Sequence, residues 1–440
     1  MATNKTTRRQ WLQTAAQASA GALAFPYVVP ASALGKGGEV APSNRIVMGA
    51  IGTGGQGRGN LGRFLGFKEI QVVAVCDVET NHRHAARDMV NKKYDNKDCA
   101  THNDFRKLVA RKDIDAVSIA TPDHWHALTS IAAANAGMDI YCEKPLANSV
   151  GEGRAICKAV ERNKVILQTG SHERSNPNCR FACELVRNGR IGKLKTIRIN
   201  LPCSDGHHAK VLEMNKETQP ITDPPEGFDY DFWLGHTPKV PYTAKRCHFW
   251  WRFILSYGGG EMTDRGAHVI DIGQLGNHTD DTGPVEFEAE GKASKTGLFD
   301  AFMQYRFENR FANGVRLIGG EQGPRGLKFE GDEGWIFVHI HGGKLEAEPA
   351  SLLQEKIGED EIRLGRSPSH HDNFLAAVKS RKPPFASAEI GHRTASICHL
   401  NNIAMKVGRK LKWDPKTERI LDDDQANGLL TPKMRPPWNL

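Results

Sequence analysis

A glycine-rich turn between an apolar run and a helical stretch constrains this chain more than any other feature. Residues 45–52, RIVMGAIG, are typical of a buried parallel strand. They lead into Gly52, Gly54 and Gly57, which satisfy the spacing G-x-G-x-x-G. In a dinucleotide-binding unit these glycines permit a tight turn, a close approach to a pyrophosphate, and packing of the helix on the strand. The N-terminus of that helix faces the phosphates, and we also assign Arg58, directly after the loop, to the cofactor.

A carboxylate at the end of the next apolar run supports the same interpretation. Residues 70–77, IQVVAVCD, end in Asp77 about twenty residues after the glycines, where an acid accepts hydrogen bonds from the ribose 2′-hydroxyl. The glycine spacing alone is weak evidence, but a strand, a helix and an acid in this order are specific. Asp77 favours NAD because it repels the 2′-phosphate of NADP, whereas Arg83 could accommodate that phosphate, so both cofactors stay open.

Apolar runs and helical stretches continue to alternate up to about residue 170, which predicts a doubly wound parallel sheet. Ligands of such sheets bind beyond the carboxyl ends of the strands. Two of those ends carry the stretches TPDHWH (121–126) and EKP (143–145). Trp125 could equally lie in the hydrophobic core or beside the nicotinamide. The residues that we assign to the cofactor from these stretches are Thr121, Pro122, Trp125, His126, Glu143 and Lys144.

Two further patterns suggest acid–base chemistry. Lys144 follows a strand and precedes Pro145, so it could bind a substrate oxygen, although a surface lysine is the commoner outcome. In GGGEMTDRGAHVID (258–271), Asp264 and His268 are four positions apart and would share one face of a helix. The residues themselves leave two interpretations open: a catalytic pair, or an N-cap at Thr263 or Asp264 followed by a buried histidine.

Taken together, the glycine loop, TPDHWHA, CEKPLA, GGGEMTDRGAHVIDI and the stretch SHHDNFLAAVKSRKPPFASAEIGHRTASICHLNNIAMKVGRKLKWDP resemble the Gfo/Idh/MocA family of sugar and inositol oxidoreductases. The resemblance extends from about Arg45 to Pro415. It implies an α/β fold, in which an N-terminal Rossmann domain precedes a C-terminal α+β domain with an open, largely antiparallel sheet. It also implies a nicotinamide cofactor between the domains and a homo-oligomer, either a dimer or a tetramer.

The resemblance implies catalytic roles for Lys144, Asp264 and His268. The histidine would be the general base, the aspartate would orient the sugar or the imidazole, and the lysine would help to bind the same oxygen. Other members often carry an aromatic residue where this chain has Arg265, so we include Arg265 among the substrate contacts and consider an anionic sugar.

Signals in the second half are weaker. Trp250, Trp251 and Arg252 could line a sugar pocket or form a hydrophobic clasp, and we assign Arg174 and Arg252 to the substrate. Alternating runs within residues 285–340 predict antiparallel hairpins, and the helical region from residue 371 is expected to pack back on the first domain. His339 and His341 would share one strand face, but no third ligand stands at a persuasive spacing, so we predict no metal site.

The first 33 residues have the layout of a twin-arginine export signal. Arg8 and Arg9 precede an alanine-rich segment, and cleavage is expected after Ala33. We therefore predict a signal at 1–33, a linker at 34–43, a Rossmann domain at 44–170, and a substrate and oligomerisation domain at 171–440. The mature protein would act in the periplasm, where free dinucleotide is scarce, so its cofactor would be tightly bound.

Composition excludes several partners. The formal net charge is +8, but basic residues are mixed with acids, so nucleic-acid binding is not indicated. After the leader no apolar run is long enough to cross a membrane, and the nine cysteines show no disulfide or zinc spacing.

The leading functional hypothesis is hydride transfer between a tightly held NAD, or NADP, and a hydroxyl of a sugar or polyol. A second hypothesis is redox-assisted glycoside cleavage through a 3-keto intermediate. A third is a sugar or dinucleotide sensor without catalysis.

Overall fold

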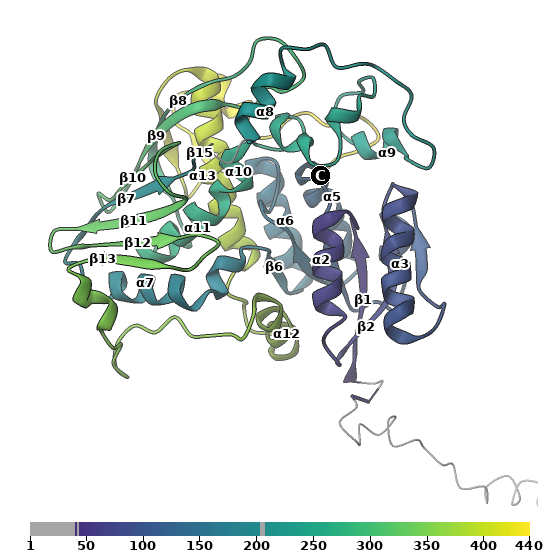
Figure 1. The fold of residues 1–440 in the computed structure, drawn as a ribbon, viewed down its shortest axis with the longest axis horizontal. Coiled ribbons are helices and arrows are strands. Elements are labelled where there is room, and N and C mark those ends of the chain that lie inside the picture. Colours follow the sequence, from purple (N-terminus) through teal and green to yellow (C-terminus); the bar gives the residue numbers. More distant parts are fainter. Residues whose placement is uncertain (1–39, 42–43, 203–206) are drawn as a thin grey trace, which may run out of the picture. The chain divides into compact units, whose positions relative to one another are not determined.

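A computed structural model describes residues 40–41, 44–202 and 207–440, so the expected export signal lies outside the described residues. One compact unit runs from Ile46 to Leu440, and it contains both sheets (Figure 1). The first sheet is wholly parallel and the second is largely antiparallel. The predicted fold class is therefore confirmed.

The first sheet has six parallel strands in the order β3-β2-β1-β4-β5-β6. Its strands are β1 (Ile46–Ile51), β2 (Ile70–Cys76), β3 (Ala100–His102), β4 (Ala116–Ile119), β5 (Asp139–Cys142) and β6 (Leu167–Thr169). The helices between them are α2 (Gly55–Phe64), α3 (Thr80–Tyr94), α4 (Phe105–Val109), α5 (Asp123–Asn135) and α6 (Val150–Asn163). The chain order reverses on either side of β1, so the ends of β1 and β4 open a crevice for a ligand.

The second sheet has nine strands in the order β13-β12-β11-β7-β10-β9-β8-β14-β15. Its strands are β7 (Leu194–Asn200), β8 (Pro284–Lys292), β9 (Met303–Phe311), β10 (Arg316–Gly320), β11 (Gly326–Gly331), β12 (Trp335–His339), β13 (Leu345–Glu348), β14 (Leu411–Asp414) and β15 (Arg419–Ile420). All the described pairings in it are antiparallel except that of β10 with β7.

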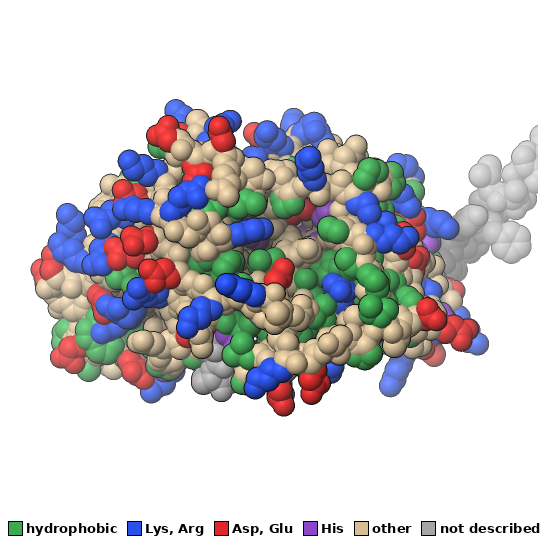
Figure 2. All heavy atoms as spheres, turned by 90° about the horizontal axis from the view of Figure 1, so that it is seen from above, with side chains coloured by type: hydrophobic (Ala, Val, Ile, Leu, Met, Phe, Trp, Pro, Cys, Tyr) green, Lys and Arg blue, Asp and Glu red, His purple; other side chains and the backbone are tan. Residues whose placement is uncertain are grey.

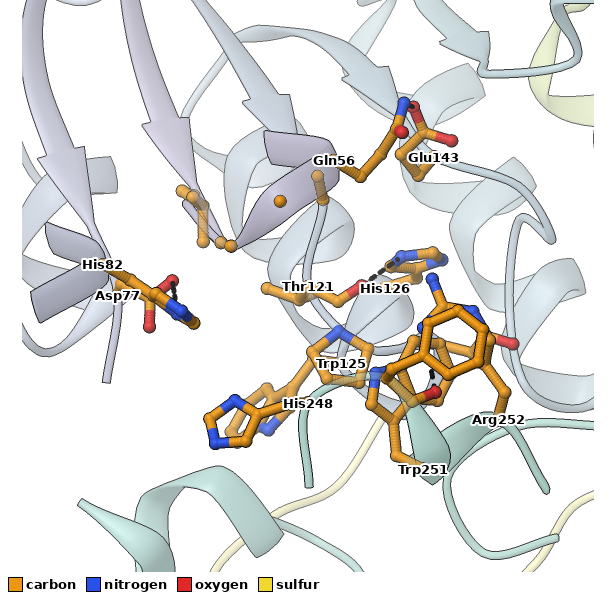
Figure 3. Close-up of a pocket in the computed structure, with 18 of the residues that line it drawn as sticks. Gln56, Asp77, His82, Thr121, Trp125, His126, Glu143, His248, Trp251 and Arg252 are labelled. Carbon is orange, nitrogen blue, oxygen red and sulfur yellow. Dashed lines mark hydrogen bonds and ion pairs between the residues drawn. The ribbon is translucent and has the colours of Figure 1, made fainter. Parts of the chain in front are cut away.

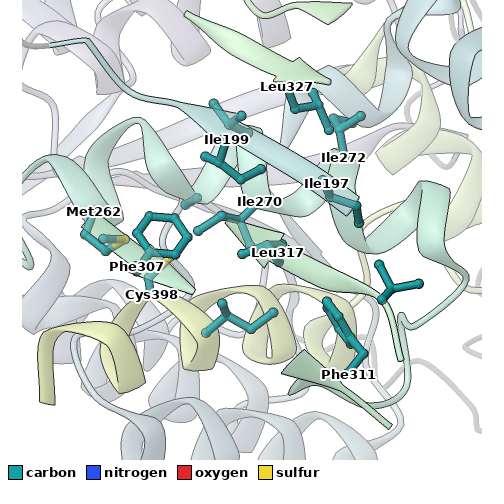
Figure 4. Packing of buried hydrophobic residues seen from close by; sticks show 14 of the residues in the cluster. Ile197, Ile199, Met262, Ile270, Ile272, Phe307, Phe311, Leu317, Leu327 and Cys398 are labelled. Atoms are coloured by element: carbon teal, nitrogen blue, oxygen red, sulfur yellow. The ribbon is translucent and has the colours of Figure 1, made fainter. Parts of the chain in front are cut away.

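Helices cover one face of this second sheet (Figure 1). They are α7 (Pro177–Arg187), α11 (Gly266–Asn277) and α13 (Ala388–Val407). Apolar side chains of β7, such as Ile197 and Ile199, pack with Ile270 of α11 and Cys398 of α13 in the core shown in Figure 4. Helix α7 begins at a favourable sequence, since Asn176 caps it just before a proline at the first helical position.

The remaining elements are helices and single helical turns. They are η3 (His172–Ser175), α8 (His207–Met214), α9 (Tyr230–Leu234), η4 (Ala244–Arg246), η5 (Trp250–Phe253), α10 (Glu261–Asp264), η6 (Ala350–Gln354), α12 (His370–Ser380) and α14 (Asp424–Asn427). Helix α12 packs on the first sheet, where Phe374 lies in the same cluster as Phe64 and Tyr141. Near residue 438 the chain also returns to the first domain, because the Trp438 ring contacts Trp125 with centroids 4.9 Å apart.

The surface carries charges of both signs. On the face in Figure 2, Lys and Arg side chains are interspersed with Asp and Glu. Within residues 44–202 and 207–440, no helix is both long and apolar enough to cross a membrane.

Arg154 of α6 joins the two domains through two carboxylates. Its guanidinium donates to Glu389 at 2.7 and 2.8 Å and to Glu418 at 3.0 and 2.7 Å. Burial alone would raise the pKa of Glu389, but the hydrogen bonds and charge of Arg154 outweigh it and lower that pKa to about 2.

We expect Arg154→Met to lower the free energy of unfolding by about 2 kcal/mol at neutral pH, because hydrogen bonds to charged groups are lost. The folded-state pKa of Glu389 is below its ordinary 4.5, so this stabilisation is present above pH 4.5 and is lost as the pH falls through about 2. The deficit of the variant in thermal unfolding should therefore shrink over that range. Arg87→Met is the control, since among the described residues Arg87 forms an ion pair only with the exposed Asp88 beside it; an equal loss in both variants would contradict the assignment.

Candidate active site

The carboxyl ends of the first sheet open into a cavity of about 730 Å³, whose opposite wall comes from the second domain. Figure 3 shows Asp77 and His82 on one side of it and Glu143 and Arg252 on others. Most of the residues expected from the sequence meet there. Those that line the cavity are Gly52, Gly54, Asp77, Thr121, Pro122, Trp125, His126, Glu143, Lys144, Arg252, Asp264, Arg265 and His268.

The glycine loop has the geometry that its spacing predicts. Gly52 has φ +79°, and a Cβ there would lie 2.5 Å from the Thr121 nitrogen. A Cβ on Gly57 would lie 1.9 Å from the Gly52 oxygen, so only glycine lets α2 approach β1 this closely. The first turn of α2 has no acidic residue and no side-chain cap, so its N–H groups face the cavity uncompensated.

Asp77 is held by the glycine loop. Its Oδ2 accepts a 2.6 Å hydrogen bond from the Thr53 nitrogen, and its Oδ1 accepts one of 2.9 Å from the Glu79 nitrogen. Arg83 is occupied elsewhere, because its guanidinium donates to the Asp77 carbonyl, Asn103 and Thr80. Arg83 does not line the cavity.

Arg58 does not lie where the sequence placed it. Its guanidinium folds back to donate a 2.7 Å hydrogen bond to the Thr53 carbonyl, and Arg58 is not among the lining residues. The expected direct contact with the cofactor is therefore corrected: Arg58 braces the turn from behind.

Glu143 is fixed by the helix that follows the glycine loop. Its Oε1 accepts hydrogen bonds from Gln56 at 2.9 Å and Asn60 at 2.8 Å. Because both donors are amides of α2, the carboxylate at the end of β5 is locked to the same helix that offers its N-terminus to the cavity (Figure 3).

Trp125 and His126 serve as buried walls. The Trp125 indole N–H donates to the Trp233 carbonyl at 2.9 Å, and its ring packs edge-on against Phe105. Both ring nitrogens of His126 contact backbone carbonyls, those of Pro145 at 2.7 Å and Thr121 at 3.0 Å. These contacts leave each ring with one orientation at the edge of the cavity.

Lys144 and Asp264 form an ion pair across the two domains. The ammonium donates to Asp264 Oδ1 at 2.8 Å and to its carbonyl at 2.6 Å, and Arg252 Nε donates to the same Oδ1 at 3.3 Å. Burial alone would raise the pKa of Asp264, but the charges of Lys144 and Arg252 outweigh it and hold that pKa well below its ordinary value.

The stretch from Gly260 to Asn277 is two helices, not one. Helix α10 ends at Asp264 and α11 begins at Gly266, with Arg265 between them. The interpretation of Thr263 or Asp264 as an N-cap is wrong, because the cap positions are Gly260 and Arg265 and neither makes a side-chain cap bond. The break places the Asp264 carboxylate on Lys144 while His268 lies in the first turn of α11.

His268 is buried at the cavity wall. Its Nδ1 is enclosed and has no hydrogen-bond partner among the described residues. Burial, followed by the positive charge of Lys144, holds the pKa of this imidazole well below its ordinary value.

Several lining residues were missed from the sequence. Asp123 stands at the start of α5, and burial raises the pKa of its carboxyl well above the ordinary value. His172 and His341 also face the cavity, from η3 and from the turn after β12. His341 was considered only as a strand partner of His339; β12 in fact ends at His339, and His341 has φ +66°. Asp123 lies within the stretch 121–126 and His341 beside His339, both singled out in the sequence, but neither was assigned to the cavity.

Arg265, Arg252 and Trp251 line the cavity, but Trp250 does not. Arg265 lines the cavity and donates to Glu261 at 2.9 Å, with a 2.8 Å contact to a ring nitrogen of His207. Arg252 lies 4.5 Å above the Trp251 ring, and both line the cavity, whereas Trp250 does not.

Arg174 does not contact the cavity, so its assignment to the substrate is corrected. The side chain is 1% exposed, and its Nε donates to Asp271 at 2.7 Å while another nitrogen donates to Asp280 at 2.6 Å. Thr394 of α13 completes the cluster by donating to Asp271 at 2.8 Å. Arg174 therefore fixes η3 to α11 inside the second domain.

Comparison with known families finds matches along nearly the whole described chain. A family model described as "Oxidoreductase family, NAD-binding Rossmann fold" matches residues 46–171. A second, described as "Oxidoreductase family, C-terminal alpha/beta domain", matches residues 177–440.

Curated relatives match over shorter stretches. The levoglucosan dehydrogenase of Pseudarthrobacter phenanthrenivorans is 38% identical over 246 residues, which are 55% of this chain and 50% of that protein. The alpha-N-acetylgalactosaminidase of Shewanella oneidensis is 29% identical over 204 residues, 42% of this chain and 44% of that protein. These alignments cover half or less of the relatives' own length.

A solved structure has the same fold. The WlbA dehydrogenase from Bordetella pertussis, in complex with NADH and UDP-GlcNAcA, superposes with a TM-score of 0.60 at 16% identity, covering 84% of this chain and 99% of that one.

We expect Arg174→Met to lower the free energy of unfolding by about 3–5 kcal/mol, because it leaves the carboxylate of Asp271 buried without its cation. Arg252→Met is the matched control: it should cost clearly less, since Lys144 still neutralises Asp264. Chemical denaturation of both variants measures the difference. A stable Arg174→Met protein would refute the structural role.

Proposed function

The chain belongs to the Gfo/Idh/MocA oxidoreductase family, and from that premise we propose that it transfers a hydride between a nicotinamide dinucleotide and a hydroxyl-bearing carbon of a sugar or polyol. The observation that carries the proposal is that one cavity is lined both by residues suited to a dinucleotide and by residues suited to acid–base chemistry. The glycine loop and Asp77 lie at one end, and Lys144, Asp264 and His268 line the same space.

The residues at the strand ends fit such a cofactor. The first turn of α2 offers uncompensated N–H groups to a pyrophosphate, and the Asp77 carboxylate is oriented by two backbone donors. A cavity of about 730 Å³ has the size range of cofactor and substrate pockets. Thr121 Oγ1 is buried at its edge without a partner among the described residues, so it is available to a ligand.

Bound there, the nicotinamide would supply the hydride acceptor. His268 takes the proton of the substrate hydroxyl, since imidazole is the side chain suited to this transfer near neutral pH. Lys144 has three N–H donors and directs two of them at Asp264. The third is left for the substrate oxygen, and Asp264 keeps the ammonium in place.

NAD suits this site better than NADP. A carboxylate at Asp77 repels a 2′-phosphate, and the guanidinium of Arg83 is bonded to the backbone and to Asn103 and Thr80. The proposed export rests on residues 1–33 alone, and in the periplasm the enzyme would have to keep its cofactor bound. Asp77, Glu143 and the loop are held in position before any ligand binds, which favours retention.

Glycoside cleavage is the second candidate, favoured by the likeness to an alpha-N-acetylgalactosaminidase. Oxidation of a ring hydroxyl acidifies the neighbouring C–H, and the leaving group at the next carbon then departs by elimination. Water takes its place before the carbonyl is reduced again, so the net reaction is hydrolysis. Release of free sugar without an added hydride acceptor distinguishes this reaction from net oxidation.

A homo-oligomer, either a dimer or a tetramer, is part of the proposal. The outer face of the second sheet carries cross-strand pairs such as Arg306–Glu290 and Arg316–Glu308. Light scattering of the purified protein determines the number of subunits.

The cofactor is tested first. We expect protein purified without added nucleotide to release about one equivalent of NAD(H) per chain on denaturation, identified by mass and redox state. An Asp77→Ala variant should retain clearly less, because the ribose loses its acceptor. Protein that is empty and gains no thermal stability from either NAD or NADP contradicts the proposal.

The chemistry is tested by His268→Gln. We expect kcat for sugar oxidation to fall by about 10²–10⁴-fold, the usual contribution of general base catalysis, with cofactor binding unchanged. Lys144→Ala should also reduce the rate. If both variants keep full activity, the site is not catalytic, and the alternative of a sugar or dinucleotide sensor gains support.

A further inference from the structure

A group of metal-binding side chains lies at the edge of the same cavity. His172 and Glu173 come from η3, and His341 comes from the turn after β12. One ligand atom from each of the three lies within 4.8 Å of the others. The hydride-transfer chemistry proposed above assigns no task to any of them.

The spacing of the ligand atoms fits a small tetrahedral ion. His172 Nε2 is 3.4 Å and His341 Nδ1 is 3.3 Å from the same oxygen, Oε1 of Glu173. In a tetrahedral site with bonds of about 2.0–2.1 Å, neighbouring ligand atoms are about 3.3–3.4 Å apart. These two distances match the separation of ligand atoms around a tetrahedral zinc ion, and the ligand atoms of His172 and His341 lie within 4.8 Å of each other.

The carboxylate is already oriented by its surroundings. Glu173 is buried, and its Oε2 accepts hydrogen bonds from Asn176 at 3.2 Å and from the Cys179 thiol at 3.4 Å. The backbone N–H of His341 donates to Oε1 at 3.2 Å, so the two segments are joined before an ion arrives. Such outer contacts are what fixes metal ligands in proteins.

A third imidazole provides an independent observation. The His268 ring centre lies 4.6 Å from that of His172 and 5.1 Å from that of His341. His268 is 5% exposed, and its Nδ1 has no hydrogen-bond partner within the described part of the chain. A buried, unpartnered nitrogen beside two histidines and a carboxylate indicates that this corner of the cavity accommodates a ligand.

We propose that His172, Glu173 and His341 bind a divalent transition-metal ion of the zinc class, with one coordination position open to the cavity. Two imidazoles and one carboxylate suit zinc, and three protein ligands with an open position are typical of a catalytic rather than a structural site. The proposal departs from the sequence prediction of no metal site: no third ligand stands near His339 and His341 in the sequence, and Glu173 is 168 residues from His341.

The open coordination position would let the ion bind an oxygen of the substrate. This role rests on the proposed function. A sugar hydroxyl or carbonyl oxygen bound there would be held next to His268 and polarised by the cation. Substrates with two adjacent oxygens, such as vicinal diols and hydroxy ketones, would be preferred, because one oxygen can bind the ion while the other meets Lys144.

A second group of this kind, formed by Glu79, His82 and His248, lies beside Asp77. Its nitrogen-to-oxygen contacts are 3.2 and 3.6 Å, and no buried third imidazole accompanies it among the described residues. It lies where the ribose of the dinucleotide is expected, so it serves here as the internal control.

The test uses the full chain without an affinity tag, with the dinucleotide that it retains, stripped of metal with a chelator and free of sugar. We expect isothermal titration with Zn²⁺ to show one site per chain, and Co²⁺ to give the absorption of a tetrahedral complex. His341→Ala and Glu173→Gln should each weaken Zn²⁺ binding by more than the about 10–100-fold typical of outer-shell changes. His339→Ala, a histidine bonded to Glu346 outside the cavity, should leave the affinity unchanged.

Two results overturn the proposal. One is that the unmodified protein binds no more Zn²⁺ than the double variant His172→Ala/His341→Ala. The other is uptake that survives this double variant and is lost in His248→Ala, which would assign the ion to the group beside Asp77. Because Glu173 is buried and its replacement could impair folding, the more exposed His172 and His341 carry the test. Since Zn²⁺ binding is measured without sugar and without turnover, failure to bind Zn²⁺ leaves the hydride-transfer proposal standing.

Discussion

The ion pair between Lys144 and Asp264 is the contact on which the cavity depends. It is made between the end of β5 in one domain and the end of α10 in the other, and its two side chains are only 15% and 17% exposed. Asp123 and Glu143 lie close enough to interact with this pair, and burial raises the pKa of the Asp123 carboxyl well above its ordinary value. Separation of the domains would leave Lys144 without its carboxylate, so the pair favours their contact here.

A second polar cluster sets the position of η3 from within the core. Arg174 binds Asp271 of α11 and Asp280, and Thr394 ties Asp271 to α13. Because Arg174 follows His172 and Glu173 directly, the same buried ion pairs determine where those two side chains point. The second domain thus shapes the cavity through a short segment that leaves the first sheet.

The sequence predicts what depends on local geometry. A G-x-G-x-x-G loop needs glycine at Gly52 and Gly57 for steric reasons that hold in any such unit, and Asp77 follows from its place at a strand end. Strand ends of a parallel sheet must lie on one edge, so the order of strands and helices along the chain is enough to bring the stretches at 121–126 and 143–145 together.

Other features depend on distance in space, which residue type does not encode. Arg174 and Arg252 are both arginines near polar and aromatic residues. Arg174 is structural because it binds the carboxylates of Asp271 and Asp280, which are 97 and 106 positions away in the sequence. The break at Arg265 and the turn that brings His341 to Glu173 are likewise products of packing. Arg58 was misplaced because its position after the loop says nothing about which way a long side chain folds.

The return of the chain near residue 438 has a consequence for how the protein is made. Trp438 packs on Trp125 and Phe232, and Arg435 binds the Gly235 carbonyl and Asp231. On the ribosome, Trp125 emerges some three hundred residues before its cover. Until then this indole can pack on Phe105 and Phe232 but lacks the contact with Trp438, so the wall of the pocket is completed only after residue 438 has been made.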